Sequence, residues 1–185
     1  MAWIDTIEHE EASGKTKEVY DRILREREHI ANIFLAQGME PAVLEKNMEL
    51  YLEILMGEGP LTREEREMIA VIVSAANRCA YGAVHHSEAL ETVEHDSGAL
   101  YKLIKEYSQK AETPRNKALL AYAAKITLDP KDITSDDIGD LREAGLSDEE
   151  ILRATLVAAY FNFSNRISLS LGVELEKGKT RSYRY

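Results

Sequence analysis

Residues 61–90 read LTREEREMIAVIVSAANRCAYGAVHHSEAL, and this stretch decides the fold class. Thr62 with Glu65 three positions later is a capping-box pattern, which predicts that a helix begins here and carries the apolar run 68–76. On one straight helix, Glu67 and Cys79 would lie about 18 Å apart along the axis. They can meet only if the chain turns between them. Asn77 suits such a corner, because asparagine tolerates the left-handed conformation and can cap a helix. We therefore predict a corner near Asn77, with Cys79 in the first turn of the next helix.

Helical periodicity extends over most of the remaining chain. Five further helices are predicted at residues 16–27, 81–94, 97–107, 134–143 and 147–171. Another is opened by Pro41 and closed by Gly57 and Gly59. A last one is opened by Thr113 and Pro114 and ends before Asp129 and Pro130. No alternating pattern typical of a strand competes with them. The sequence therefore predicts an all-α, single-domain helical bundle over residues 1–185.

One pattern recurs after 85 residues. Leu61-Thr62-x-Glu64-Glu65 returns as Leu146-Ser147-x-Glu149-Glu150, and Asn77 and Asn162 follow at the same offset. One interpretation is that any capped, buried helix has this pattern. The other is a duplicated helical unit, with residues 146–171 as the second copy. The basic, aromatic tail 177–185 is either a frayed terminus or an arm that contacts a neighbouring subunit.

Composition excludes several classes of function. The chain has 185 residues, of which 33 are Asp or Glu and 23 are Lys or Arg, giving a net charge of −10. A protein this acidic is not expected to bind nucleic acid or an anionic membrane. One cysteine excludes an intrachain disulfide and a Cys₄ zinc site. The absence of a long apolar run and of a signal-peptide pattern favours a cytoplasmic location.

Chemically reactive side chains gather in residues 67–86. A thiol in the first turn of a helix has its pKa lowered by the helix dipole, which makes Cys79 a candidate nucleophile. His86 lies two turns beyond Cys79, and Gly82 lies directly beneath His86. His85 projects about 100° away from His86, so at most one of the two serves any site. Because these side chains cannot converge on one ion, we expect no metal and no other cofactor.

The pattern Glu67, then Asn77-x-Cys79-x-Tyr81-Gly82-x-x-x-His86, resembles the core motif of the alkylhydroperoxidase-D-like proteins. These proteins form the peroxidase-related branch of the carboxymuconolactone decarboxylase-like superfamily. The resemblance extends to Leu61-Thr62-x-x-x-Arg66-Glu67 and to Phe161-Asn162-x-x-Asn165-Arg166. It implies an all-helical homo-oligomer that reduces peroxides, or the disulfide of a partner, by cycling two cysteines. The glutamate and the histidine of the motif, here Glu67 and His86, would form a proton relay that activates the second cysteine.

This sequence departs from the motif at that second cysteine, where Gly82 stands. No Cys-x-x-Cys disulfide can form, and the glycine costs about 1 kcal/mol of helix propensity relative to alanine. We expect the glycine to leave a small vacancy beneath His86, where water or a ligand oxygen could sit. A simple loss of the redox activity would equally explain why glycine stands in place of the second cysteine.

Three functions remain open. The first is an antioxidant, one-cysteine thiol peroxidase in which Cys79 attacks a hydroperoxide, Glu67 and His86 pass the proton, and a small thiol or a thiol protein is the reductant. Asn77, Tyr81, Gly82 and His85 would support that site. The second is a decarboxylase or isomerase acting on a small acid through His86 and Glu67. The third is a non-catalytic scaffold.

We also expect a homo-oligomer, a dimer or higher. The segments 68–76 and 156–163 are apolar on nearly every face, so one small bundle would not cover them.

Overall fold

The computed structural model describes residues 2–89 and 113–176, and these residues fall into two compact units. One unit is Met1–Glu53 with Arg166–Tyr185, and the other is Ile54–Asn165. In the described residues every regular element is a helix, which confirms the all-α prediction. None of these helices is long and apolar enough to cross a membrane. The predicted helix 97–107, the end of the predicted helix 81–94 and the tail 177–185 lie outside the described residues.

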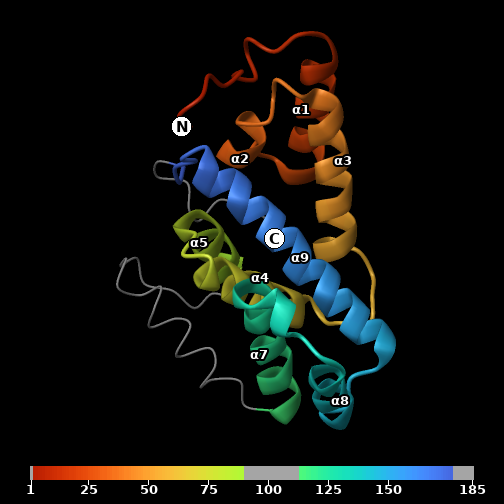
Figure 1. Ribbon diagram of the computed structural model, residues 1–185. Helices are drawn as coiled ribbons and strands as arrows, with labels where there is room; N and C mark the ends of the chain where they lie inside the picture. Colours follow the sequence, from red (N-terminus) through yellow and green to blue (C-terminus); the bar gives the residue numbers. More distant parts are fainter. Residues whose placement is uncertain (1, 90–112, 177–185) are drawn as a thin grey trace. The chain divides into compact units, whose positions relative to one another are not determined.

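The first unit is built around two helices that pack together, α1 (Gly14–Arg27) and α3 (Pro41–Tyr51), with a short helix α2 (Asn32–Leu35) between them in the chain (Figure 1). Pro41 occupies the first turn of α3, where its missing N–H costs no hydrogen bond. Tyr20 and Ile23 of α1 and Leu44 of α3 are fully buried and form the core of this unit. The sequence analysis predicted α1 and α3 but not α2.

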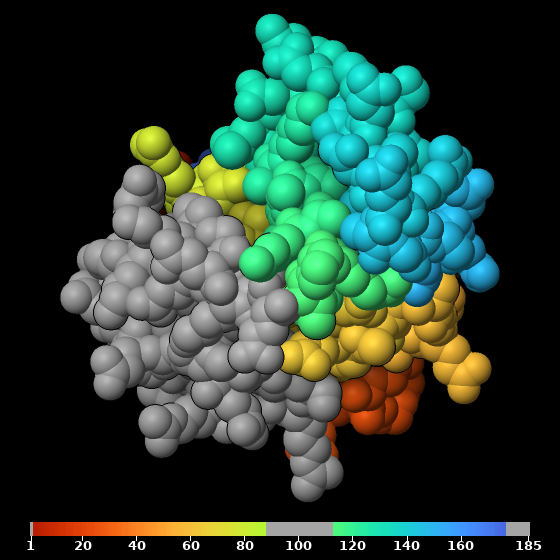
Figure 2. Space-filling view, turned by 90° about the horizontal axis from the view of Figure 1, so that it is seen from below, coloured from red at the N-terminus to blue at the C-terminus, as the bar shows by residue number. Residues whose placement is uncertain are grey.

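The described residues of the second unit form four helices and the first part of a fifth. They are α4 (Arg63–Ala76), α5 (Ala80–Ala89), α7 (Pro114–Leu128), α8 (Ser135–Glu143) and α9 (Asp148–Ser170). Helix α4 packs against both α5 and α7. Figure 2 shows α7, α8 and the first part of α9 side by side on one face of the unit. A π-helical turn, Leu52–Met56, and a 3₁₀ turn, Pro130–Asp132, were not predicted.

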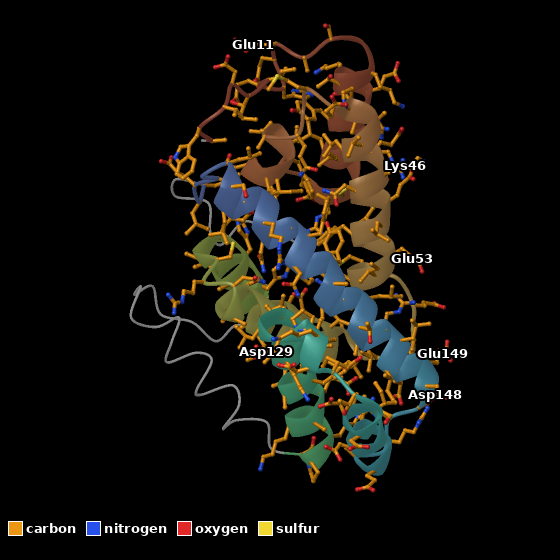
Figure 3. The ribbon with its side chains drawn as sticks, in the orientation of Figure 1. Glu11, Lys46, Glu53, Asp129, Asp148 and Glu149 are labelled. Carbon is orange, nitrogen blue, oxygen red and sulfur yellow. The ribbon has the colours of Figure 1, made fainter. Side chains whose placement is uncertain are left out.

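The predicted helix starts of this unit are confirmed. Thr62 and Glu65 form a reciprocal capping box, in which each side chain bonds the other residue's backbone N–H. Ser147 and Glu150 do the same at the start of α9. Figure 3 shows Asp148 and Glu149 in the first turn of α9, where carboxylates are stabilised by the helix dipole. Thr134 and Asp137 form a capping box at the start of α8 as well, so three of the described helices in this unit begin in the same way.

Helix α4 is the centre of the second unit. Every residue from Glu65 to Ala75 is buried, including the charged side chains of Arg66 and Glu67. The run 68–75 is therefore covered within the chain and leaves nothing for a second subunit to cover, contrary to our expectation for this segment. The segment 156–163 is only partly covered, since Leu156 and Phe163 of α9 are 44% and 46% exposed.

Candidate active site

The corner between α4 and α5 places Cys79. The Cys79 N–H donates to the Ser74 carbonyl at 2.8 Å and the Arg78 N–H donates to the Ala75 carbonyl at 2.9 Å. These two bonds form a Schellman motif, which requires a left-handed residue just after the helix. That residue is Arg78, with φ 56°. The predicted corner is confirmed, and Cys79 directly precedes α5, one position before the first turn in which we expected it.

Asn77 is the C-cap of α4, as its capping tendency predicts. Its backbone is right-handed, with φ −75° and ψ −5°, and the left-handed conformation falls on the next residue, Arg78. The Asn77 side chain closes the end of α4, because Nδ2 donates to the Val73 carbonyl at 2.9 Å. The same Nδ2 donates to Oδ1 of Asn162 at 3.0 Å. Asn77 thus joins the corner to helix α9 of the same unit.

Glu67 and His86 meet in the interior. His86 Nδ1 lies 2.7 Å from Glu67 Oε2, and the two residues are 8% and 2% exposed. Arg63, one turn before Glu67, donates to the other carboxylate oxygen, Oε1, from Nε at 2.8 Å and also from Nη2. Phe161 of α9 contacts the His86 ring edge-to-face at 4.4 Å between centroids. The imidazole is therefore held by a carboxylate at one nitrogen and by an aromatic ring beside it.

The charge of Glu67 follows from these contacts. Burial raises the pKa of the Glu67 carboxyl, whereas the charge and hydrogen bond of His86 and those of Arg63 lower it, and the net effect is a pKa below its ordinary value of 4.5. Glu67 is thus an anion near neutral pH. An ionised carboxylate can only accept hydrogen bonds, so His86 Nδ1 carries the proton and Nε2 is the nitrogen that can exchange a proton with a ligand.

Cys79 is 1% exposed, so a reagent must enter the protein to reach the thiol. Cys79 and His86 are seven residues apart, which is about 10 Å along α5. A helical side chain leans toward the helix N-terminus, so the imidazole of His86 covers the turn between the two residues.

His85 faces away from this site. Its ring contacts Tyr81, with 4.4 Å between the ring centroids, while the neighbouring His86 binds Glu67. The geometry therefore separates the two histidines as their 100° spacing predicts.

Gly82 leaves no vacancy beneath His86, and that expectation is wrong. A Cβ placed on Gly82 would lie 2.6 Å from both Ser74 Oγ and Asn165 Oδ1. Ser74 is fully buried and its hydroxyl donates to Asn165 Oδ1 at 3.2 Å. A hydroxyl and an amide thus occupy the space that the side chain of a second cysteine would need.

Three polar residues of the site were missed by the sequence analysis. Arg63 lies four residues before Glu67, which is the spacing of a helical ion pair, so this signal was available. Ser74 is the one polar residue in the apolar run 68–76. Asn165 was quoted only as part of a familial pattern, and nothing in a single sequence shows that it packs against Gly82.

No group of three His, Cys, Asp or Glu side chains in residues 2–89 and 113–176 is arranged to hold a metal ion.

A family model matches the segment that contains these residues. Residues 41–95, which include Glu67, Cys79 and His86, match the model of the carboxymuconolactone decarboxylase family. A comparison with curated proteins gave no match.

Solved structures share the fold along nearly the whole chain. The alkylhydroperoxidase AhpD core of a peroxidase-related protein from Ralstonia eutropha JMP134 has a TM-score of 0.81 at 24% identity, covering 99% of this chain and 98% of that one. A peroxidase-related protein from Silicibacter sp. TM1040 has a TM-score of 0.77 at 26% identity, covering 97% and 91%. The debrominase Bmp8 in complex with 2,3,4-tribromopyrrole has a TM-score of 0.73 at 18% identity, covering 93% and 91%. Residues 41–95 thus match the carboxymuconolactone decarboxylase family, and the chain has the fold of solved alkylhydroperoxidase-D-like, peroxidase-related structures.

Proposed function

We propose that this peroxidase-related protein is a one-cysteine thiol peroxidase. The observation that carries the proposal is the buried hydrogen bond between Glu67 of α4 and His86 of α5, the helix that Cys79 directly precedes. A thiol at the start of a helix lies against unpaired N–H groups and the positive end of the dipole, which favour the thiolate. A neighbouring imidazole supplies the acid that a leaving alkoxide needs.

The reaction proceeds in two stages that balance. The Cys79 thiol passes its proton through water to His86 Nε2, and the thiolate attacks one oxygen of a hydroperoxide. A sulfur–oxygen bond forms, the oxygen–oxygen bond breaks, and the alkoxide takes the proton back from His86, giving a sulfenic acid and an alcohol. Two molecules of an external thiol then reduce the sulfenic acid, releasing water and their own disulfide. A cycle that depends on reduced thiols suits the cytoplasm.

Glu67 contributes by holding His86 in place. Its carboxylate fixes the proton on Nδ1 and stabilises the imidazolium that forms when Cys79 ionises. Arg63 keeps this carboxylate charged inside the protein. The relay therefore works without the second cysteine, although the product is a sulfenic acid rather than an intrachain disulfide.

The test is consumption of cumene hydroperoxide and hydrogen peroxide by the whole protein, with a panel of thiol reductants. We expect turnover and a sulfenic acid on Cys79, detected by dimedone labelling and mass spectrometry. Cys79→Ser should abolish both, and Glu67→Gln should slow sulfenic acid formation about a hundredfold, the size of a general-acid contribution. Equal peroxide consumption by the wild type and Cys79→Ser would exclude the proposal.

A second candidate is acid–base chemistry on a small acid, such as decarboxylation. The buried Glu67–His86 pair favours it, because this pair persists in a site that has no second thiol. Here His86 would protonate the carbanion left when carbon dioxide departs, and Cys79 would take no part. Carbon dioxide release from a carboxylactone that is lost in His86→Gln but kept in Cys79→Ser would favour this candidate over the peroxidase.

We further propose that the protein is a homo-oligomer. Leu152, Leu156 and Phe163 of α9 are between 44% and 58% exposed, and a run of large apolar side chains along one helix is typical of an interface. Light scattering tests this proposal. A mass near 20.9 kDa, that of one chain, at micromolar concentration would exclude it.

A further inference from the structure

Asn165 is a buried amide that is only half satisfied. It is 1% exposed, and its Oδ1 accepts a hydrogen bond from the Ser74 hydroxyl at 3.2 Å. Its Nδ2, which carries two donors, is buried and has no hydrogen-bond partner among the described residues. Since buried donors are almost always paired, an amide left open in this way indicates a place where a ligand can accept.

A second asparagine on the same helix shows the usual arrangement. Asn162 Oδ1 accepts from Asn77, and its Nδ2 donates to Thr127 Oγ1 and to the Ala158 carbonyl, each at 3.0 Å. The two asparagines are three residues apart on α9 and belong to the same unit. The open amide of Asn165 is thus not shared by the neighbouring asparagine of the same helix.

That position is beside the Glu67–His86 pair. The Asn165 amide lies against Gly82, the residue directly beneath His86, and Phe161, one turn earlier on α9, contacts the His86 ring. The backbone N–H of Cys79 bonds the carbonyl of Ser74, whose hydroxyl holds the amide. The amide therefore lies beside the turn of α5 that separates Cys79 from His86.

Glycine at position 82 is what admits the amide. Any Cβ there would come within 2.6 Å of Asn165 Oδ1, so a cysteine would displace the side chain. The departure from the Cys-x-x-Cys motif and the open amide are consequently one structural feature.

We propose that Asn165 is a substrate-binding residue of this site, donating from Nδ2 to the leaving oxygen of the hydroperoxide that Cys79 attacks. The inference rests on the proposed peroxidase function and adds the oxygen-binding group. As the oxygen–oxygen bond breaks, negative charge develops on the alkoxide, and the amide stabilises it until His86 delivers the proton. Ser74 is a positioning residue, because its hydroxyl donates to Oδ1 and so holds the amide in place.

The test separates binding from turnover. In Cys79→Ser the hydroperoxide cannot react with the thiol, so the affinity of cumene hydroperoxide is measured by titration calorimetry in Cys79→Ser, Cys79→Ser/Asn165→Ala and Cys79→Ser/Asn162→Ala. We expect the Asn165 variant to bind about tenfold more weakly, the effect of one hydrogen bond to a ligand. The Asn162 variant loses a satisfied amide of the same size, so it should bind equally well although it melts earlier.

Each result decides one question. A weaker Asn165 variant supports the role of the amide, even if the wild type forms no sulfenic acid, in which case only the peroxidase proposal fails. Equal affinity in the Asn165 and Asn162 variants overturns the role of the amide, whatever the wild type does with peroxides. No binding by Cys79→Ser itself overturns it as well. A side-chain amide resonance of Asn165 that shifts on adding cumyl alcohol, the product, is an independent sign of contact.

Discussion

Asn77 Nδ2 donates to Asn162 Oδ1 across 3.0 Å, although 85 residues separate them in the chain. The same offset separates the capping-box glutamates Glu65 and Glu150, and Arg115 bonds both of these, at 2.7 and 2.6 Å. Equivalent positions of α4 and α9 therefore lie together at both ends, so the paired stretches run parallel. This pairing favours a duplicated helical unit over two unrelated capped helices, and the duplication remains a proposal.

Arg115 is expected to hold two helix starts at once. Its guanidinium bonds Glu65 and Glu150 with a side chain that is only 27% exposed. We predict that Arg115→Ala lowers the free energy of unfolding by about 2 kcal/mol, because charged hydrogen bonds to both carboxylates are lost. Urea denaturation measures this. Arg115→Lys keeps the positive charge but not the two-pronged guanidinium, so its stability should lie between those of the wild type and Arg115→Ala. An unchanged urea midpoint in Arg115→Ala would contradict the prediction.

Gly82 is expected to tolerate no side chain on its own. We predict that Gly82→Ala and Gly82→Cys each destabilise the protein by about 1–3 kcal/mol, the cost of overpacking a filled core. Combining Gly82→Cys with Ser74→Ala and Asn165→Ala removes both clashing oxygens. The triple variant should recover part of the loss and allow a disulfide with Cys79, which thiol titration before and after reduction detects. A stable Gly82→Cys single variant that forms this disulfide would contradict the prediction, because Ser74 and Asn165 would then move aside at little cost.

Glu67 is expected to make stability depend on acid pH. Its pKa in the folded protein lies below the unfolded value of 4.5, so the stabilisation is complete above pH 4.5 and is lost as the pH falls through the folded pKa. Glu67→Gln should cost about 3 kcal/mol at pH 7, as expected for breaking a buried pair. That difference should shrink below pH 4.5. Glu64→Gln, an exposed change on the same helix, is the control, and a gap that stays constant with pH would refute the assignment.

Arg78 is expected to carry backbone strain at the corner before Cys79. A non-glycine residue at φ 56° costs about 1 kcal/mol, which glycine avoids. We predict that Arg78→Gly raises the free energy of unfolding by about that amount. Thermal melting checks the sign, with Arg78→Ala as the control that keeps the strain. A lower melting temperature in Arg78→Gly would mean that the arginine side chain itself is needed.

Helix starts could be predicted from the sequence better than helix ends. A capping box is local chemistry within four residues, so Thr62 and Ser147 could be recognised without any tertiary information. Helix ends depend on a left-handed residue. Helices α8 and α9 use Gly145 and Gly172 for it, at φ 88° and 58°. Helix α4 uses Arg78, which carries no such signal, and the sequence therefore pointed to Asn77.

The candidate site likewise has one part that the sequence predicts and one part that it does not. Glu67 and His86 could be paired from sequence because a turn near residue 77 is the one way for them to meet, and the resemblance to a known motif supplied the same pair. The Ser74–Asn165 pair joins residues 91 positions apart. Its effect on Gly82 is a matter of tenths of an ångström, which periodicity does not contain. The expected vacancy failed for that reason.

The 85-residue separation between the partners of α4 and α9 has a consequence for how the protein is made. On the ribosome, α4 emerges well before α9, so Asn77 and Glu65 are synthesised long before Asn162 and Glu150 exist. The contacts that lock both ends of α4 have high contact order, and closing so long a loop must precede any gain from them. The corner that positions Cys79 is therefore completed late, when the last helix of the chain has been delivered.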